Sequence, residues 1–180
     1  MSKKVLIISS SQRKDGNSDI LCGEFLKGAR AAGHQVVKIS LRNKHINYCT
    51  GCNYCANNDF TGCAQIDDMD GIIDRMIASD TIVFATPIYF YSISGQMKTF
   101  IDRLCSKYTR IVNKEFYYIM TAADTSKDAI TFALGEFKGL MVCLENPVEK
   151  GYLFAGGVWR PGEVIDTEFM QKAFEAGKNI

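Results

Sequence analysis

The sequence has little of several features that mark particular protein classes. Its 180 residues include three prolines and two histidines, and the formal net charge is only +1. Without a long basic run, this balance argues against a nucleic-acid partner. The longest strongly apolar stretch, near residues 81–91, contains Pro87 and falls short of the roughly 20 apolar residues that span a bilayer, so we expect no membrane partner. No small-residue cleavage site follows the first strand-like residues, so we also expect no signal peptide and a cytoplasmic location.

Cysteine, in contrast, is abundant: there are seven, and four of them lie within 15 residues. These four are Cys49, Cys52, Cys55 and Cys63. In a cytosolic protein, such grouping favours metal or redox chemistry over a framework of disulfide bonds. The other three stand apart among apolar neighbours, and we expect each to be a small buried hydrophobic residue. They are Cys22, Cys105 and Cys143.

Strand-like and helical patterns alternate along the chain. Apolar runs predict strands at residues 5–9, 81–85, 116–120 and 152–155, and residues 35–41 are predicted to form a further strand. Apolar residues at helical spacing predict helices at residues 18–33, 69–77, 97–108, 130–141 and 169–176. Strands that are apolar throughout are buried on both faces, so the sheet should be parallel with helices on each side. The sequence therefore predicts an α/β, flavodoxin-like three-layer sandwich whose five parallel strands follow the order 2-1-3-4-5. We expect one domain over residues 1–180, with a cysteine-rich loop at about 45–65.

The loop between the first predicted strand and the first predicted helix, residues 9–18, is suited to binding phosphate. The N-terminus of a helix presents unpaired N–H groups and a partial positive charge. Arg13 adds a guanidinium that can form paired hydrogen bonds to a phosphate, and Ser11, Asn17 and Ser18 add neutral donors. The same residues would also serve as a plain polar turn followed by a helix N-cap. The loop lacks both the P-loop pattern and the Gly-x-Gly-x-x-Gly pattern of a dinucleotide fold.

Two further loops are expected at the same edge of the sheet. The loop after the third predicted strand contains Pro87, which fixes one backbone angle, followed by Ile88 and three aromatic residues at 89–91. Its backbone could hydrogen-bond the edge of a flat ring system and its aromatic rings could stack beside that system, or they could simply cap the core. The loop after the fourth strand has small residues, Thr121 and Ala122, that let a ligand approach the backbone. Trp159 is equally suited to a substrate site, a subunit contact or the free surface.

The first two loops resemble motifs of a known family. Residues 11–18, Ser-Gln-Arg-Lys-Asp-Gly-Asn-Ser, resemble the Ser-Pro-Arg-x-x-Gly-Asn-Ser/Thr loop of NADPH-dependent FMN reductases, with Gln12 where proline is common. Residues 87–103 resemble the family's Pro-x-Tyr-Phe…Gln-x-Lys…Asp-Arg block, in which we interpret Gln96, Lys98, Asp102 and Arg103 as structural or interface residues. The resemblance covers nearly the whole chain and implies a homodimer or homotetramer. It implies ten FMN contacts: Ser11, Arg13, Asn17, Ser18, Pro87, Ile88, Tyr89, Phe90, Thr121 and Ala122.

The spacing of the four grouped cysteines, Cys-x2-Cys-x2-Cys-x7-Cys, carries a second resemblance. Four thiolates are the usual complement of a [4Fe–4S] cluster, whereas structural zinc commonly uses two separated pairs. The motif resembles that of the iron–sulfur flavoproteins, a branch of the same family in which the cluster exchanges electrons with FMN. It implies that Cys49, Cys52, Cys55 and Cys63 are the metal ligands. Reduced cysteines without metal, a labile cluster, zinc and a redox disulfide stay open as alternatives.

The function expected from the resemblance is that of an FMN-dependent NAD(P)H oxidoreductase. It would pass electrons to a small-molecule or protein acceptor, through an iron–sulfur cluster if one is bound. The flavin supplies the redox chemistry and the protein supplies binding and orientation, so we expect no catalytic acid or base. A flavodoxin-type electron carrier and a non-enzymatic metal-binding module are the alternatives. Neither the electron acceptor nor the choice between NADH and NADPH follows from the sequence.

Overall fold

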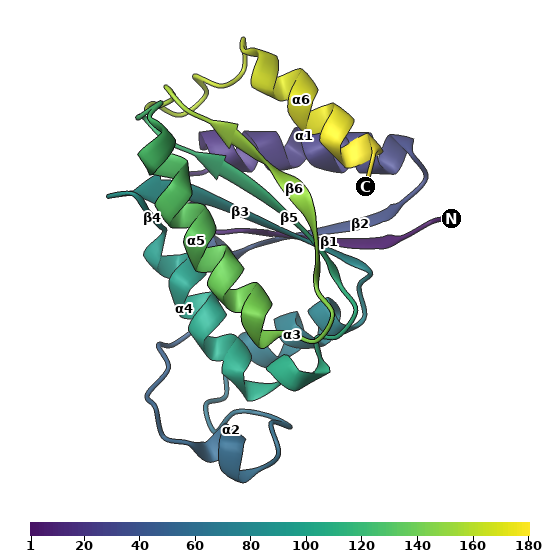
Figure 1. Ribbon diagram of the computed structural model, residues 1–180, viewed down its shortest axis with the longest axis vertical. Helices are drawn as coiled ribbons and strands as arrows, with labels where there is room; N and C mark the ends of the chain where they lie inside the picture. The colour runs from purple at the N-terminus through teal and green to yellow at the C-terminus, as the bar shows by residue number, and fades with distance from the viewer.

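A computed structural model describes residues 1–180 and shows one mainly parallel sheet with helices on both faces (Figure 1). The strands are β1 (Lys4–Ser9), β2 (Gln35–Ser40), β3 (Thr81–Tyr89), β4 (Ser92–Ile93), β5 (Glu115–Thr121) and β6 (Val148–Ala155). The helices are α1 (Asn17–Ala31), α2 (Tyr54–Asn57), α3 (Met69–Ile77), α4 (Gly95–Arg103), α5 (Lys127–Cys143) and α6 (Glu168–Lys178). Short 3₁₀ helices follow β2 and α4: η1 (Leu41–Asn43), η2 (Leu104–Ser106) and η3 (Tyr108–Arg110).

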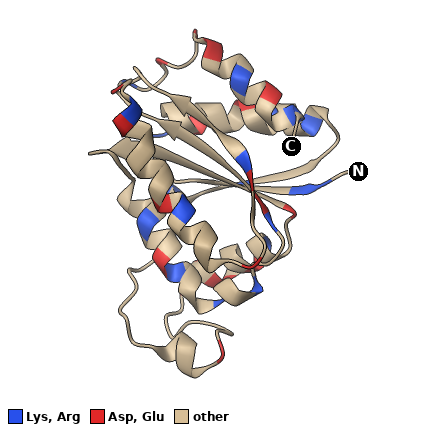
Figure 2. Cartoon of the chain, viewed as in Figure 1, with Lys and Arg blue, Asp and Glu red and all other residues tan.

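The parallel strands lie in the order β2-β1-β3-β5-β6, and β4 is a short antiparallel addition to β3. This is the predicted flavodoxin-like order, so the fold prediction is confirmed, with β4 as a sixth strand that the sequence did not indicate. No helix of the structure has the length and apolar character needed to cross a membrane. Charged residues of both signs are interspersed along the helices, in keeping with the small net charge (Figure 2).

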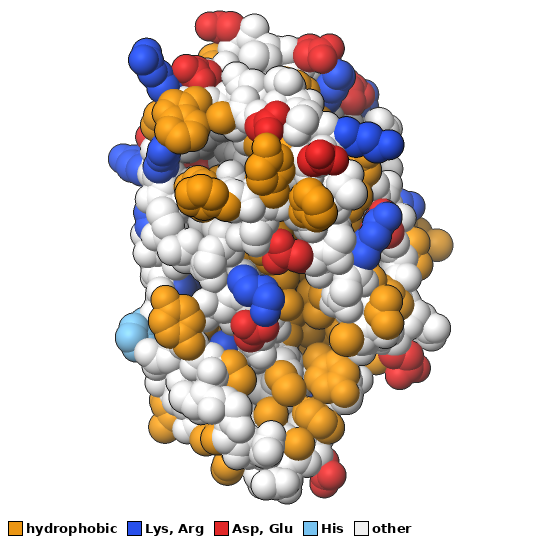
Figure 3. Space-filling view, turned by 60° about the vertical axis from the view of Figure 1, so that its left-hand side comes forward, with side chains coloured by type: hydrophobic (Ala, Val, Ile, Leu, Met, Phe, Trp, Pro, Cys, Tyr) orange, Lys and Arg blue, Asp and Glu red, His pale blue; other side chains and the backbone are white.

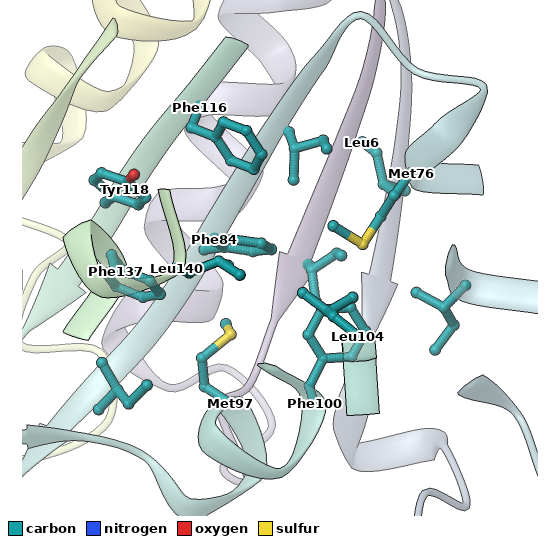
Figure 4. Close-up of a cluster of buried hydrophobic side chains, with 14 of the residues drawn as sticks. Leu6, Met76, Phe84, Met97, Phe100, Leu104, Phe116, Tyr118, Phe137 and Leu140 are labelled. Carbon is teal, nitrogen blue, oxygen red and sulfur yellow. The ribbon is translucent and has the colours of Figure 1, made fainter. Parts of the chain in front are cut away.

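Alternate residues of each central strand face two separate hydrophobic cores. On β1, Val5 and Ile7 pack under α1 and α6, whereas Leu6 and Ile8 pack under the helices of the other face. Figure 4 shows the second core, where the ring of Phe84 lies among the side chains of β5, α4 and α5. The Phe84 ring stacks on that of Phe137, with 5.6 Å between their centres. Burial on both faces explains why the central strands β1 and β3 consist largely of apolar residues, whereas the edge strands β2 and β6 include exposed polar ones.

Helices α1 and α6 pack closely through two glycines. A Cβ atom at Gly28 would lie 1.9 Å from the carbonyl oxygen of Phe174, and one at Gly177 would lie 2.0 Å from that of Phe25. Neither position has room for a side chain, so the glycines allow the two helices to approach more closely than other residues would. The C-terminal helix is thereby fixed against the N-terminal one.

The predicted loop at residues 86–95 is instead a β-hairpin, and this expectation was wrong. Strand β3 continues to Tyr89, since Pro87 pairs with Thr121 of β5 at a level where β1 has already ended. A proline is tolerated there because one side of the strand has no partner that needs its N–H group. Ile88 then pairs with Ile93 in the hairpin.

Three other local expectations were wrong. The predicted helix over residues 97–108 ends at Arg103, where 3₁₀ turns replace it, and the short helix α2 was not predicted. Cys105 lies in the first of these turns, and Cys143 is the last residue of α5. Both are exposed rather than buried. Cys22 is fully buried on the inner face of α1, as expected.

Candidate functional site

A cavity of about 420 Å³ opens at the carboxyl ends of the parallel strands. It is formed by the loops after β1, β3, β5 and β6, which is where ligands bind in open α/β sheets. All ten residues predicted to contact a flavin line this one cavity: Ser11, Arg13, Asn17, Ser18, Pro87, Ile88, Tyr89, Phe90, Thr121 and Ala122. Its size lies within the usual range of about 300–1,000 Å³ for small-molecule sites.

The first turn of α1 forms one end of the cavity and fits a phosphate group. Gly16 is the N-cap residue, and no side chain caps the helix. The first N–H groups of α1 are therefore free to bind an anion, which the helix dipole also favours. The loop is tight, because Ser11 Oγ and the Gly16 N–H group both donate to the carbonyl of Arg13, at 2.9 and 3.2 Å. A Cβ atom at Gly16 would lie 2.6 Å from Ser11 Oγ, so a larger residue there would displace the Ser11 hydroxyl from its hydrogen bond with Arg13.

The segment after β6 is hydrogen-bonded to the loop that precedes α1. Arg13 Nη1 donates to the carbonyl of Trp159 at 2.8 Å, and Asn17 Nδ2 donates to that of Arg160 at 2.9 Å. The Asn17 side chain thus braces the loop, while the remaining N–H groups of the Arg13 guanidinium stay available. Glu163 accepts hydrogen bonds from the backbone N–H groups of Arg160 and Trp159, which lower the pKa of its carboxyl group.

A buried line of hydroxyl groups joins the first loop to the hairpin. Ser94 Oγ donates to Ser10 Oγ at 2.8 Å, and Ser10 Oγ donates to the carbonyl of Ala85 at 3.2 Å. The backbone N–H group of Ser94 donates to Thr86 Oγ1 at 3.0 Å. These groups are buried and hydrogen-bonded, so they fix the distance between the two sides of the cavity.

The aromatic residues at the turn of the hairpin lie at the mouth of the cavity. Phe90 and Tyr91 have φ angles of 49° and 62°, in the left-handed region that aromatic residues rarely adopt. Both residues at the centre of a type I′ hairpin turn need positive φ, and here Phe and Tyr occupy these positions in place of Asn and Gly. Phe90 is fully exposed. Such local strain is characteristic of ligand-binding turns.

Tyr91 ties this turn to the loop after β5. Its hydroxyl donates to Asp124 Oδ2 at 2.7 Å, and Asp124 Oδ1 accepts from the backbone N–H group of Ser126 at 2.7 Å. The bonds to Ser126 and Tyr91 lower the pKa of Asp124, and the carboxylate in turn raises the pKa of Tyr91. Tyr91 therefore remains a proton donor at neutral pH, and the pair closes one side of the mouth.

The four predicted metal ligands lie at the other end of α4 from the cavity. Helix α4 begins directly after β4 and ends at Arg103, next to the cysteine-rich segment, and its nine residues make it about 13.5 Å long (Figure 1). Cys49 and Cys52 are exposed, and Cys55 and Cys63 are partly exposed. Figure 3 shows hydrophobic side chains in an upper and a lower group on the α4 face, with charged side chains between them.

An ion pair fixes the cysteine-rich segment to α4. Arg103 Nη1 and Nη2 donate to the two carboxylate oxygens of Asp67 at 2.6 and 3.1 Å, and both side chains are almost completely buried. Arg103 also donates to the carbonyl of Asn47 at 2.8 Å and to Cys63 Sγ at 3.6 Å. Burial alone would raise the pKa of Asp67, but the hydrogen bonds from Arg103, Asn47 and Met69 outweigh it and lower the pKa. Arg103 therefore has a structural role.

The four thiols have suitable chemistry for a soft metal, since thiolates select iron–sulfur clusters and zinc. Their arrangement is not that of ligands: no three Cys, His, Asp or Glu side chains of the chain are gathered to hold a metal ion. Cys52 is fully exposed, and hydrogen bonds from the Tyr54 N–H group and the Thr50 hydroxyl lower its pKa. Cys55 instead contacts Cys105, with 3.8 Å between the two sulfur atoms. The structure thus brings the ten residues predicted to contact flavin together, but not the four cysteines predicted to bind metal.

Sequence reasoning missed several residues of the cavity and of the cysteine-rich segment. Tyr91 and Asp124 line the cavity and bind each other, although 33 positions separate them. Although Cys105 is exposed, its thiol is partly shielded from water, and this desolvation together with the hydrogen bond with Cys55 raises its pKa to about 11. No local motif marks these pairs, because each is made by a contact between distant segments. Trp159, whose role the sequence left open, lines the cavity and is largely exposed.

Known proteins resemble the chain over nearly its whole length. A family model of NADPH-dependent FMN reductases matches residues 3–134. An iron–sulfur flavoprotein of Archaeoglobus fulgidus is 34% identical over 98% of this chain and 78% of its own. One of Methanosarcina thermophila is 34% identical over 98% and 93%. The structure of an NAD(P)H:quinone oxidoreductase from Methanothermobacter marburgensis superposes with a TM-score of 0.74 at 19% identity, over 99% of this chain and 96% of that one. The chain therefore belongs to the NADPH-dependent FMN reductase family.

Proposed function

We propose that this FMN-dependent NAD(P)H oxidoreductase binds its flavin in the cavity at the carboxyl ends of the strands. The observation that carries the proposal is that all ten residues chosen from two sequence motifs and one loop line the same cavity. The uncapped first turn of α1 supports placing the phosphate there, beside Arg13. The apolar stretch Pro87–Phe90 and the small residues Thr121 and Ala122 then face the ring system.

When bound, FMN supplies hydride acceptance and donation. The chain's own residues bind the cofactor, orient it and limit the access of water. Ser11 and Ser18 offer hydroxyl groups at the phosphate end, and Asn17 keeps that end in shape through its bond to Arg160. No side chain of the cavity needs to act as an acid or base for hydride transfer. The electron acceptor is a small molecule or protein that reaches the cavity through its aromatic mouth.

The test is FMN binding and reduction in matched variants. Arg13→Ala removes a charged donor from the phosphate end, and a hydrogen bond to a charged group contributes about 1.5–3 kcal/mol, so we expect FMN affinity to fall at least about tenfold. Arg75→Ala removes an exposed arginine of α3, away from the cavity, and serves as the control. Rapid bleaching of the bound flavin by NAD(P)H is expected for wild type. A protein that refuses added FMN, or equal losses in both variants, contradicts the proposed site.

We further propose that Cys49, Cys52, Cys55 and Cys63 hold an iron–sulfur cluster. Support comes from four thiols within 15 residues and from relatives that are named iron–sulfur flavoproteins. Because the thiols are not gathered in this structure, the segment has to rearrange around a cluster. The test is metal and sulfide analysis with a visible spectrum of anaerobically purified protein. About four irons and four sulfides per chain support the proposal. Flavin without metal, or zinc without sulfide, contradicts it.

We also propose that the protein is a homodimer or homotetramer. Tyr89, Phe90, Tyr91 and Trp159 are exposed around the mouth, and such a group of aromatic side chains is typical of a surface that another molecule covers. A second copy would also supply walls for a nicotinamide that one chain leaves open. Light scattering on the FMN-loaded protein measures the assembly, and a monomer at micromolar concentration contradicts the proposal.

A further inference from the structure

Cys105 lies outside the four-cysteine motif in the sequence but beside it in space. Cys55 Sγ donates a hydrogen bond to Cys105 Sγ across 3.8 Å, although the two residues are 50 positions apart. Cys55 is on α2, within the cysteine-rich segment, and Cys105 is on η2, directly after α4. The two short helices pack against each other. The thiol pair is therefore a product of the fold, and the spacing of the motif does not create it.

The surroundings of the pair allow the two sulfur atoms to approach further. A disulfide bond of about 2.05 Å requires them to move together by about 1.8 Å. Helix α2 has four residues, none of them buried, and residues with positive φ, Asn53 and Asp59, flank it. An exposed segment of this kind shifts at low cost, since few packed contacts resist it. Cys105 is exposed and Cys55 partly exposed, so a small solute reaches both thiols.

We propose that Cys55 and Cys105 are a redox-active pair that low-molecular-weight disulfides convert into a disulfide bond. One cysteine loses its proton and attacks a sulfur of the small disulfide, whose S–S bond breaks and releases one small thiol. The second cysteine loses its proton and attacks the protein-bound sulfur, which releases the second small thiol. Two protein thiols and one small disulfide thus give one protein disulfide and two small thiols. The two electrons lost by the protein sulfurs reduce the small disulfide.

The consequence of this bond concerns the metal site, and this step rests on the proposed iron–sulfur cluster. A cysteine ligates a metal through its thiolate, and a cysteine sulfur held in a disulfide bond has no thiolate to offer. With Cys55 bound to Cys105, the motif keeps three thiols of its four. The oxidation state of the pair therefore decides whether the cluster can be assembled. Cys105, which belongs to no motif, thus regulates cluster assembly.

The first test maps the disulfide in reduced, metal-free, full-length protein after treatment with oxidised glutathione. Free thiols are blocked, the protein is digested, and the linked peptides are identified by mass spectrometry. We expect the peptides of Cys55 and Cys105 to be joined, with loss of two hydrogen atoms from the intact mass. Cys143→Ser, which removes another exposed cysteine, leaves the bond in place, and Cys105→Ser abolishes it. Cys55 found free, joined to glutathione or joined to another cysteine overturns the proposal.

The second test measures iron and sulfide uptake by the same oxidised wild type, without added thiol, and by a sample reduced beforehand with dithiothreitol. Because sulfide itself cleaves disulfide bonds, the peptide map is repeated after loading, and the comparison uses oxidised protein whose Cys55–Cys105 bond is still intact. We expect the reduced sample to load and the oxidised sample to lose uptake. If the oxidised sample loads as much iron as the reduced one, the proposed regulation by Cys105 is refuted, whereas the proposed cluster is supported. If neither loads iron, the proposed cluster and its control both fail, and the peptide map still decides whether the disulfide forms.

Discussion

The buried ion pair between Asp67 and Arg103 leads to a sharp prediction about stability. In Asp67→Asn the carboxylate disappears, and the Arg103 guanidinium keeps its charge while its side chain is only 2% exposed. Removing one partner of a buried pair costs about 3–5 kcal/mol, because the remaining charge is left uncompensated. The matched control is Asp102→Asn, which breaks the pair with Lys98 on the surface of α4, where both side chains are about half exposed. An exposed pair contributes about 0.2–1 kcal/mol.

Urea unfolding at neutral pH measures the difference between the two variants. With a denaturant slope of about 2 kcal/mol per molar, the midpoint of Asp67→Asn should fall by about 2 M, and that of Asp102→Asn by less than about 0.5 M. Midpoints that shift equally would refute the reasoning, since burial would then make no difference. Iron uptake is a second readout, because the pair holds the segment that carries Cys63.

The same pair fixes the sign of the pH dependence. The pKa of Asp67 is lowered in the folded protein, because the hydrogen bonds from Arg103, Asn47 and Met69 outweigh burial. A lowered pKa stabilises the fold above the ordinary range of an aspartate, and this contribution is lost as the pH falls through the folded value. Wild type should therefore lose stability on acidification more steeply than Asp67→Asn. Parallel curves for the two proteins would contradict this assignment.

Three further predictions concern single positions. Gly28→Ala should lower the free energy of unfolding by about 1–3 kcal/mol in thermal denaturation, because its Cβ meets the backbone of α6. Gly23→Ala, on the open side of α1, should raise the free energy of unfolding by up to about 1 kcal/mol, and equal effects of the two substitutions would contradict the packing. Gly16→Ala should weaken FMN binding in a fluorescence titration, since its Cβ displaces Ser11 Oγ; unchanged affinity would place the phosphate elsewhere. Burial raises the pKa of Cys22 to about 12, so iodoacetamide should label it only after unfolding, and labelling of the native protein would contradict its burial.

The sheet was predictable because its signal is local. Apolar runs such as Val5–Ile8 mark strands that are buried on both faces, and their alternation with helical patterns leaves few topologies. Most of the residues that line the cavity were also predictable, since Ser11–Ser18 and Pro87–Phe90 are continuous segments at the ends of strands. The structure adds that these segments meet in one cavity.

Contacts between distant segments account for what the sequence did not reveal. The extension of β3 beyond Pro87 depends on the lengths of its neighbours, because β1 pairs with β3 only as far as Ala85, whereas β5 pairs with it as far as Pro87. The bond between Tyr91 and Asp124 and the contact between Cys55 and Cys105 join parts of the chain that no pattern connects. Cys105 was expected to be buried because it has apolar neighbours in the sequence, but it lies in the 3₁₀ turn after α4, where it is exposed.

The close packing of α1 against α6 has a consequence for how the protein is made. The two helices join residues 17–31 to residues 168–178, so the contact spans almost the entire chain. A ribosome releases the N-terminal helix long before the C-terminal one exists, and the apolar face shared by β1, β3 and α1 stays uncovered on one side during that time. The other face closes earlier, since α3, α4 and α5 precede β6. Emergence of the last helix is therefore the step that seals the core under α1 and α6, and a pause in translation before residue 168 prolongs the exposure of that core to solvent.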